Sequence, residues 1–295
     1  MFSCFSQTKA MIVLSSMKNL HGEGPRRNMD TWRLIPLETH NCFMNMAIDE
    51  AILSSRIENL VPNTIRFYQW KPSAVSIGKN QSPQEQVYLD ALRENGVDLV
   101  RRTSGGGTVY HDQKGEITYS ITAQTRDLGQ DVTAVYTRVY AAVNDALRLL
   151  GIPADYSLGN RKNCPNLTVA GKKIGGSAQT LRHGVVQQHG TLLLSVDLSL
   201  MFRFLRVPFT EDCSFAAKIA KRKITSIQNE LHHQISTKTV EKDLTQGFKT
   251  ILKIQLEESA LTQYERALAN RFYNEKFSAV TWNYKGKLTS SQGAT

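Results

Sequence analysis

Residues 101–112, RRTSGGGTVYHD, decide the fold of this chain. The apolar run 97–100 leads into them, so the pattern predicts a strand, two arginines, a glycine loop and a second strand. Three consecutive glycines have no side chains, so their backbone N–H groups can approach an anion closely. Two arginines at the mouth would add planar, charged forks suited to carboxylate or phosphate. The same sequence could also form an ordinary glycine hairpin with surface arginines, so the prediction of an anion-binding loop needs evidence from elsewhere in the chain.

A second glycine-rich motif gives that support. Residues 166–194, NLTVAGKKIGGSAQTLRHGVVQQHGTLLL, place Lys173 in a tight turn between two short apolar segments. Gly175-Gly176-Ser177-Ala178 follow, and small residues again allow close backbone approach. A lysine in a turn is ordinarily solvated, so its glycine-rich setting is what makes Lys173 a candidate.

The two motifs carry a resemblance. RRTSGGGTVYHD followed by GKKIGGSAQ and QHGTLL resembles the lipoate–protein ligase and octanoyltransferase family, which shares a catalytic domain with the biotin–protein ligases. NMAIDEAIL at 45–53 and FYQWKPSAVSIGKNQ at 67–81 also match, and the resemblance covers about residues 29–285. It implies an α/β fold of the α+β type: a mixed, largely antiparallel sheet with flanking helices and a small helical C-terminal extension.

The resemblance also implies roles for residues. Lys173 is the implied catalytic residue, because a fixed ammonium there would stabilise the charge that develops as an acyl carbon is attacked. Lys172 fits less well, since the family has arginine or lysine at that position. Arg102 matches a residue that binds nucleotide. The remaining residues implied for the nucleotide and acyl sites are Ser104, Gly105, Gly106, Gly107, Thr108, Val109, Tyr110, His111, Gly176, Ser177, Ala178, His189 and Gly190. No metal ligands are predicted.

His111 and Asp112 suggest a general-base pair at first sight. Adjacent residues on a strand point to opposite faces, so they cannot form a simple dyad. We expect His111 to have a structural hydrogen-bonding role. His189 is expected to orient groups beside the site rather than act as a base.

The four cysteines, Cys4, Cys42, Cys164 and Cys213, are too scattered for a disulfide framework and predict a reducing, cytoplasmic compartment. Bacterial octanoyltransferases of the family use a cysteine nucleophile beside the lysine. In the most similar type it lies about fifteen residues before the lysine, where this chain has Leu158. Cys164 is nearer the lysine, and a gap could bring it into register. In a second type the cysteine follows the lysine, but the flanks of Cys213 do not match.

Three functions remain open. The leading hypothesis is ATP-dependent ligation, in which lipoate or octanoate becomes an acyl-AMP and passes to a lysine of a lipoyl carrier domain, with Mg²⁺ neutralising the ATP phosphates. The carrier would belong to a 2-oxoacid dehydrogenase or be the glycine cleavage H protein. The alternatives are octanoyl transfer from acyl carrier protein through a Cys164 thioester, and a non-catalytic ligand-binding member of the fold. Biotin ligation is disfavoured, because that branch's Gly-Arg-Gly-Arg-type loop is missing.

The composition fits these hypotheses. Of the 295 residues 41% are hydrophobic and 21% charged, as in globular proteins, and no apolar run approaches the roughly 20 residues of a membrane span. The net charge of +10 suits an acidic partner such as a carrier domain. Cations are spread along the chain, apart from one cluster of Lys218, Lys221, Arg222 and Lys223. Zinc spacing and aromatic RNA-binding patterns are missing, so nucleic acid is the weaker interpretation of the charge.

The pattern divides the chain into three parts. Residues 1–28 are predicted to be a disordered extension or an overlong start, and a targeting peptide remains open. Residues 29–207 form the predicted catalytic core, and 208–295 a helical C-terminal extension of the same domain. The expected strands include Thr64–Trp70 and Ala74–Ile77. The expected helices are 45–58, with Asp49 and Glu50 near its start, 83–95, 132–150, 239–254 and 259–272.

Overall fold

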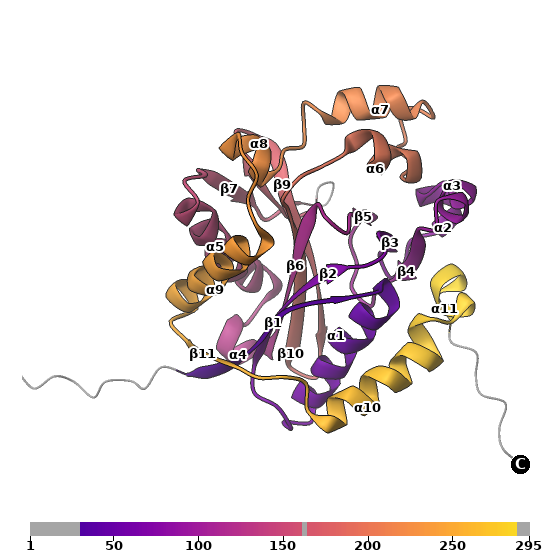
Figure 1. Cartoon of the computed structure of the whole chain (residues 1–295). Helices are drawn as coiled ribbons and strands as arrows, with labels where there is room; N and C mark the ends of the chain where they lie inside the picture. Colours follow the sequence, from indigo (N-terminus) through magenta and orange to yellow (C-terminus); the bar gives the residue numbers. More distant parts are fainter. Residues whose placement is uncertain (1–29, 161–163, 288–295) are drawn as a thin grey trace, which may run out of the picture.

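The computed structural model describes residues 30–160 and 164–287 (Figure 1), so the expected extension 1–28 lies outside the described residues. The strands are β1 (Thr31–His40), β2 (Thr64–Trp70), β3 (Ala74–Ile77), β4 (Asp98–Arg101), β5 (Val109–His111), β6 (Glu116–Gln124), β7 (Ala154–Ser157), β8 (Asn166–Val169), β9 (Lys172–Arg182), β10 (Val185–Leu193) and β11 (Gln255–Glu258). The helices are α1 (Cys42–Ile57), α2 (Pro83–Gln86), α3 (Leu89–Glu94), α4 (Thr125–Leu128), α5 (Val132–Leu149), α6 (Leu198–Phe204), α7 (Cys213–Ala220), α8 (Ile227–Leu231), α9 (Thr237–Leu252), α10 (Gln263–Phe272), the π-helix η1 (Tyr273–Phe277) and α11 (Val280–Lys285).

A mixed sheet forms the centre of the molecule. Its order is β11-β1-β2-β6-β10-β9-β8-β7, and a smaller sheet has the order β4-β3-β5. β1 runs parallel to both β11 and β2, whereas the pairs from β2 to β7 are antiparallel. The prediction of a mixed, largely antiparallel sheet with flanking helices is therefore confirmed.

Helices cover both faces of the large sheet (Figure 1). The main apolar core joins one face to α5 and α9, with Phe67, Tyr119, Val139 and Phe248 all buried in it. On the other face lie α1 and α10, whose own apolar cluster includes Ile48, Ile52 and Leu268. No helix of the described ranges is long and apolar enough to cross a membrane.

Two expected elements differ from the structure. The helix expected over 83–95 is broken into α2 and α3, because Val87 bridges Leu205 and the Tyr88 N–H donates to the carbonyl of Phe204. The helix expected from residue 45 begins at Cys42, where the Asn41 side chain caps the Met44 N–H. Asp49 and Glu50 therefore lie in the middle of α1, and their expected place near the helix start, where a carboxylate would complement the helix dipole, is wrong.

The C-terminal part of the chain is not purely helical. β11 adds a parallel strand to β1, a pairing that a four-residue polar segment does not reveal by its pattern. α10 then starts at a capping box formed by Thr262 and Glu265. Glu265 is fully buried and accepts two hydrogen bonds from Arg33 of β1, at 2.8 and 2.6 Å. These contacts tie 208–287 into the same core as the rest of the described chain.

The contact between α5 and α9 depends on Gly247. A Cβ built at this position would lie 2.3 Å from the carbonyl oxygen of Ala142, on the facing helix. Alanine normally stabilises a helix relative to glycine, but here it would force the two helices apart. We expect Gly247→Ala to lower the free energy of unfolding by about 1–3 kcal/mol in urea titrations. The exposed Lys249→Ala is the control, and equal stability of the two variants would contradict this packing.

Candidate active site

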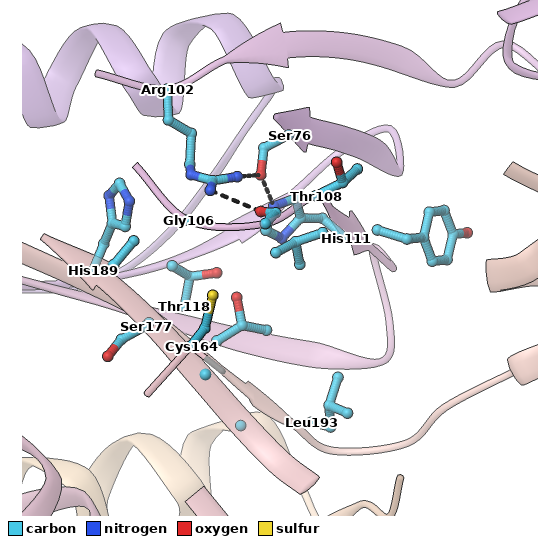
Figure 2. A pocket seen from close by; sticks show the side chains of 18 of the residues that line it. Ser76, Arg102, Gly106, Thr108, His111, Thr118, Cys164, Ser177, His189 and Leu193 are labelled. Carbon is cyan, nitrogen blue, oxygen red and sulfur yellow. Dashed lines mark hydrogen bonds between the residues drawn. The ribbon is translucent and has the colours of Figure 1, made fainter. Parts of the chain in front are cut away.

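A cavity of about 280 Å³ lies between the glycine-rich motifs. Figure 2 shows residues from separate segments around it, including Arg102, His111, Cys164 and His189. The two motifs that the sequence analysis singles out therefore face one space. The predicted site residues that line it are Arg102, Gly106, Gly107, Thr108, Val109, Tyr110, His111, Cys164, Lys173, Gly176, Ser177, Ala178, His189 and Gly190.

Arg102 holds the glycine loop from within. Its Nη2 donates to the carbonyls of Gly105 and Gly107, both at 2.9 Å, and Gly106 between them has a φ of +88°. The guanidinium is almost completely buried, and burial lowers its pKa to about 10, so it remains charged at neutral pH. Arg102 thus shapes the loop that closes one wall of the cavity.

Arg101 lies elsewhere, and its predicted place at the mouth of an anion site is wrong. Its guanidinium donates to the carbonyls of Lys79 and Gln81, at 2.9 and 2.7 Å, and to those of Trp282 and Asn283, both at 3.0 Å. It therefore fastens the C-terminal helix α11 to the turn after β3. Adjacent residues of a strand point to opposite sides, which separates the roles of the two arginines.

A buried chain of hydrogen bonds connects Arg102 to Glu116. Arg102 Nη1 donates to Ser76 Oγ at 2.8 Å, Ser76 Oγ lies 2.7 Å from His111 Nε2, and His111 Nδ1 lies 2.6 Å from Glu116 Oε1. Ser76 already accepts from Arg102, so its hydroxyl is free to donate to His111, which then donates to Glu116. The histidine ring also stacks on Trp70 at 3.8 Å. The predicted structural role of His111 agrees with this position. Ser76 belongs to no motif that would mark it as a site residue in the sequence.

His189 belongs to a second buried network. Its Nε2 lies 2.7 Å from Ser104 Oγ, and its Nδ1 lies 3.7 Å from Asp49 Oδ2. Burial lowers the pKa of His189, which favours the neutral ring. Burial alone would raise the pKa of Asp49, but the nearby His189 ring and the charge of Arg66, which donates a hydrogen bond to the carboxylate at 2.9 Å, outweigh burial and lower that pKa. Ser104 itself is buried behind the glycine loop and supports the wall rather than lining it.

Lys173 stands on β9 at the opposite wall. A Cβ built on Gly176 would lie 3.0 Å from Lys173 Cε and 3.1 Å from its Nζ, so the ammonium folds over the glycine and an alanine there would crowd it. Lys173 is solvent-accessible and lines the cavity, and desolvation by the surrounding protein lowers its pKa, which a Cys164 thiolate would oppose. Lys172 is exposed and does not line the cavity.

Cys164 lies across from Lys173. It is a free, exposed thiol directly before β8, and it lines the same cavity. β8 pairs with β9, so that Asn166 is opposite Gly176. Cys164 and Lys173 line one cavity, although Leu158 occupies the position expected for the nucleophile. The neighbouring residues 161–163 lie outside the described residues. The other two cysteines in the described part are outside the cavity: Cys42 is buried in α1, and Cys213 begins α7.

Much of the apolar wall comes from a segment without a motif. Met201, Phe202 and Leu205 of the α6 region, with Leu193 and Ile224, line the cavity. Position 190 on the cavity wall requires glycine, because a Cβ there would lie 2.2 Å from the Tyr119 hydroxyl. Among the described lining residues, the site therefore combines an apolar chamber with the cations Arg102 and Lys173 and the thiol of Cys164.

Ser76→Ala tests the buried chain. The change removes the oxygen that accepts from Arg102 and leaves the facing nitrogen of His111 without its partner. An unpaired buried polar group costs about 1–3 kcal/mol, so we expect an unfolding free energy lower by that amount in urea titrations. Ser73→Ala, on the turn before β3, is the control. Unchanged stability in Ser76→Ala would show that the chain contributes nothing measurable.

Known proteins resemble this chain over most of its length. Octanoyltransferase LipM of Brevibacillus brevis is 33% identical over 87% of this chain and 100% of its own length. Octanoyltransferase LipM of Bacillus subtilis is 31% identical over 87% of this chain and 99% of its own. Among solved structures, a bipartite lipoate protein ligase from Thermoplasma acidophilum has a TM-score of 0.76 at 28% identity, covering 90% of this chain and 100% of that one. A lipoate-protein ligase A bound with ATP has a TM-score of 0.75 at 29% identity, covering 87% and 99%.

These relatives correct the leading functional hypothesis. The leading hypothesis from the sequence is an ATP-dependent ligase with Mg²⁺, but relatives that match along their whole length are named octanoyltransferases. The ligase hypothesis is therefore wrong as the main interpretation, and the thiol in the cavity is the feature it left unexplained. The model of the lipoyl protein ligase A/B catalytic domain matches residues 41–249, which includes both glycine-rich motifs. The chain belongs to the lipoate–protein ligase and octanoyltransferase family.

Proposed function

We propose that the protein is an octanoyltransferase that takes an octanoyl group from acyl carrier protein and passes it to a lysine of a lipoyl carrier domain. The observation that carries the proposal is that Cys164 and Lys173 line one cavity with an apolar wall. At about 280 Å³ the cavity is near the lower end of the roughly 300–1,000 Å³ typical of small-molecule sites, which suits a single acyl chain.

The first step loads the enzyme. The Cys164 thiolate attacks the thioester carbonyl carbon of the donor, an S–C bond forms, and the bond to the carrier's thiol breaks after a tetrahedral intermediate. The departing thiolate takes a proton. Lys173 acts on this step in two ways: a neighbouring ammonium favours the thiolate nucleophile, and it stabilises the negative oxygen of the intermediate.

The second step unloads it. The neutral amine of the acceptor lysine attacks the Cys164 thioester, a C–N bond forms, and the thiolate leaves while the amine loses a proton. No ATP is consumed, because the thioester of the donor already supplies the activated acyl group that a ligase must make with ATP. The apolar side chains Phe202, Leu205 and Ile224 hold the chain and keep water from the thioester. The carrier of a 2-oxoacid dehydrogenase and the glycine cleavage H protein are both candidate acceptors.

Intact-mass measurement tests the proposal. Incubation with octanoyl acyl carrier protein should add one octanoyl group, which hydroxylamine removes and a lipoyl domain discharges. Lipoate with ATP should release no pyrophosphate. A protein that forms no adduct and leaves the lipoyl domain unmodified would be a non-catalytic member of the fold, and the proposal would fail.

A further inference from the structure

One basic cluster of the sequence has no part in the chemistry described so far. Lys218, Lys221, Arg222 and Lys223 lie on α7 and the turn after it, and all four are exposed. Within 30–160 and 164–287, none of them forms an ion pair with a carboxylate. Four unpaired cations side by side repel one another, so such a cluster is stabilised by an anionic partner.

The backbone places this cluster at the rim of the cavity. The Lys173 N–H donates to the carbonyl of Lys223 at 2.8 Å, and the Thr225 N–H donates to the carbonyl of Lys173 at 2.9 Å. Ile224, between these two partners, lines the cavity. α7 itself packs on α6 (Figure 1). Phe202 of α6 forms part of the apolar wall. The basic turn therefore runs outward from the catalytic lysine onto α7.

Exposed aromatic groups continue the same surface. Phe209, just before α7, is 56% exposed, and Phe215 on α7 is 46% exposed. The nearby Asp212 does not neutralise the cations, because its carboxylate accepts hydrogen bonds from the N–H groups of Ser214 and Phe215 at the start of α7. Exposed aromatic side chains next to unpaired cations are typical of a protein-binding surface and not of a solvated face.

We propose that α7 and the turn 221–223 are the docking surface for the acyl donor, an acidic carrier protein that bears its acyl group on a long phosphopantetheine arm. This inference rests on the proposed function. The net charge of +10 and the unpaired cations complement an acidic helix. An arm of that length lets a carrier sit on α7 and still reach Cys164, whereas a lysine substrate has only a four-carbon stem and must approach the mouth itself.

Charge reversal tests the surface. The variant Lys218→Glu/Lys221→Glu/Arg222→Glu reverses the charge of three of the four cluster residues, none of which lines the cavity. Lys238→Glu/Lys242→Glu/Lys249→Glu on α9 makes the same change in net charge away from the site and is the matched control. The α7 variant should load octanoate from octanoyl acyl carrier protein at least about ten-fold more slowly at low salt, with a weaker salt dependence. With octanoyl-pantetheine, which needs no docking surface, it should match the wild type.

The arms separate the possible outcomes. An equal decrease in the loading rate with both donors would mean that the variant has a damaged pocket. An unchanged loading rate with both donors would mean that the cluster does not bind the carrier. Either result overturns the inference. Normal loading with slow discharge to the lipoyl domain would assign the surface to the acceptor and overturn it as well. A wild-type protein that takes octanoate from neither donor would overturn the proposed function itself.

Discussion

Replacing Lys173 with alanine is expected to slow octanoyl transfer by about 10²–10³-fold and to leave the fold intact, because one preorganised charge contact is lost. The ammonium lies over Gly176, on the wall of the cavity that Cys164 also lines. Single-turnover loading, followed by intact mass, measures the rate, and thermal melting checks the fold. Lys172→Ala is the matched control, since that side chain is exposed and outside the cavity.

The pH dependence gives the lysine a second readout. Desolvation lowers the pKa of Lys173, so its ammonium is lost at a lower pH than that of an ordinary lysine as the pH rises. Loading should therefore decline on the alkaline side earlier than a solvated lysine would allow. Lys173→Arg keeps its charge and should move that decline to higher pH. Near-normal turnover of Lys173→Ala, or a larger loss in Lys172→Ala, would move the catalytic role away from this residue.

The sequence predicts best where a signal is local. Thr64–Trp70 and Ala74–Ile77 are strands with the expected bounds, because short β-rich runs separated by a turn signal carry their own pattern. α5 covers 132–149, one residue short of its expected end, because its apolar positions recur at helical spacing over several turns. The glycine loop and the Lys173 turn are likewise local motifs, and the fold brings them to one cavity.

What depends on tertiary contacts stays hidden. Asp49 looks like a surface acid near a helix start, yet α1 begins earlier and buries its carboxylate against Arg66 and His189. Two adjacent arginines look equivalent in the sequence. Because neighbouring side chains point to opposite sides, Arg101 contacts α11 whereas Arg102 holds the glycine loop. The α6 wall has no motif because any apolar residues of suitable size can fill it. β11 is too short and polar to be recognised before β1 is seen beside it.

The choice between ligase and transferase depended on the alignment of one thiol. Counting residues back from the lysine reaches Leu158, which is 37% exposed and outside the cavity. Loops tolerate changes of length well, so a count along the chain does not measure distance to the lysine. The lining of the cavity decides instead, because it includes Cys164 and Lys173 but not Leu158.

Cys164→Ser is accordingly expected to abolish the acyl-enzyme and to lower octanoyl transfer by at least roughly 10⁴-fold, as for loss of a nucleophile in other acyl-transfer enzymes. A serine hydroxyl needs a general base to become a nucleophile, and its proton is lost far less readily than that of a thiol. The Cys164 thiol, by contrast, forms its anion readily beside the Lys173 ammonium. The measurement is the hydroxylamine-sensitive mass gain with octanoyl acyl carrier protein, together with octanoylation of a lipoyl domain. The fold should persist, since Cys164 is exposed and makes no core contact.

Cys213→Ser is the matched control for this change. Its thiol is also free and partly exposed, but it begins α7 and lies outside the cavity, so loading should stay within about two-fold of the wild type, as for surface changes generally. Loss of the adduct in Cys164→Ser but not in Cys213→Ser would fix the thioester on Cys164. An adduct that persists in Cys164→Ser and disappears in Cys213→Ser would place the nucleophile on α7, and the mechanism proposed for this cavity would be wrong.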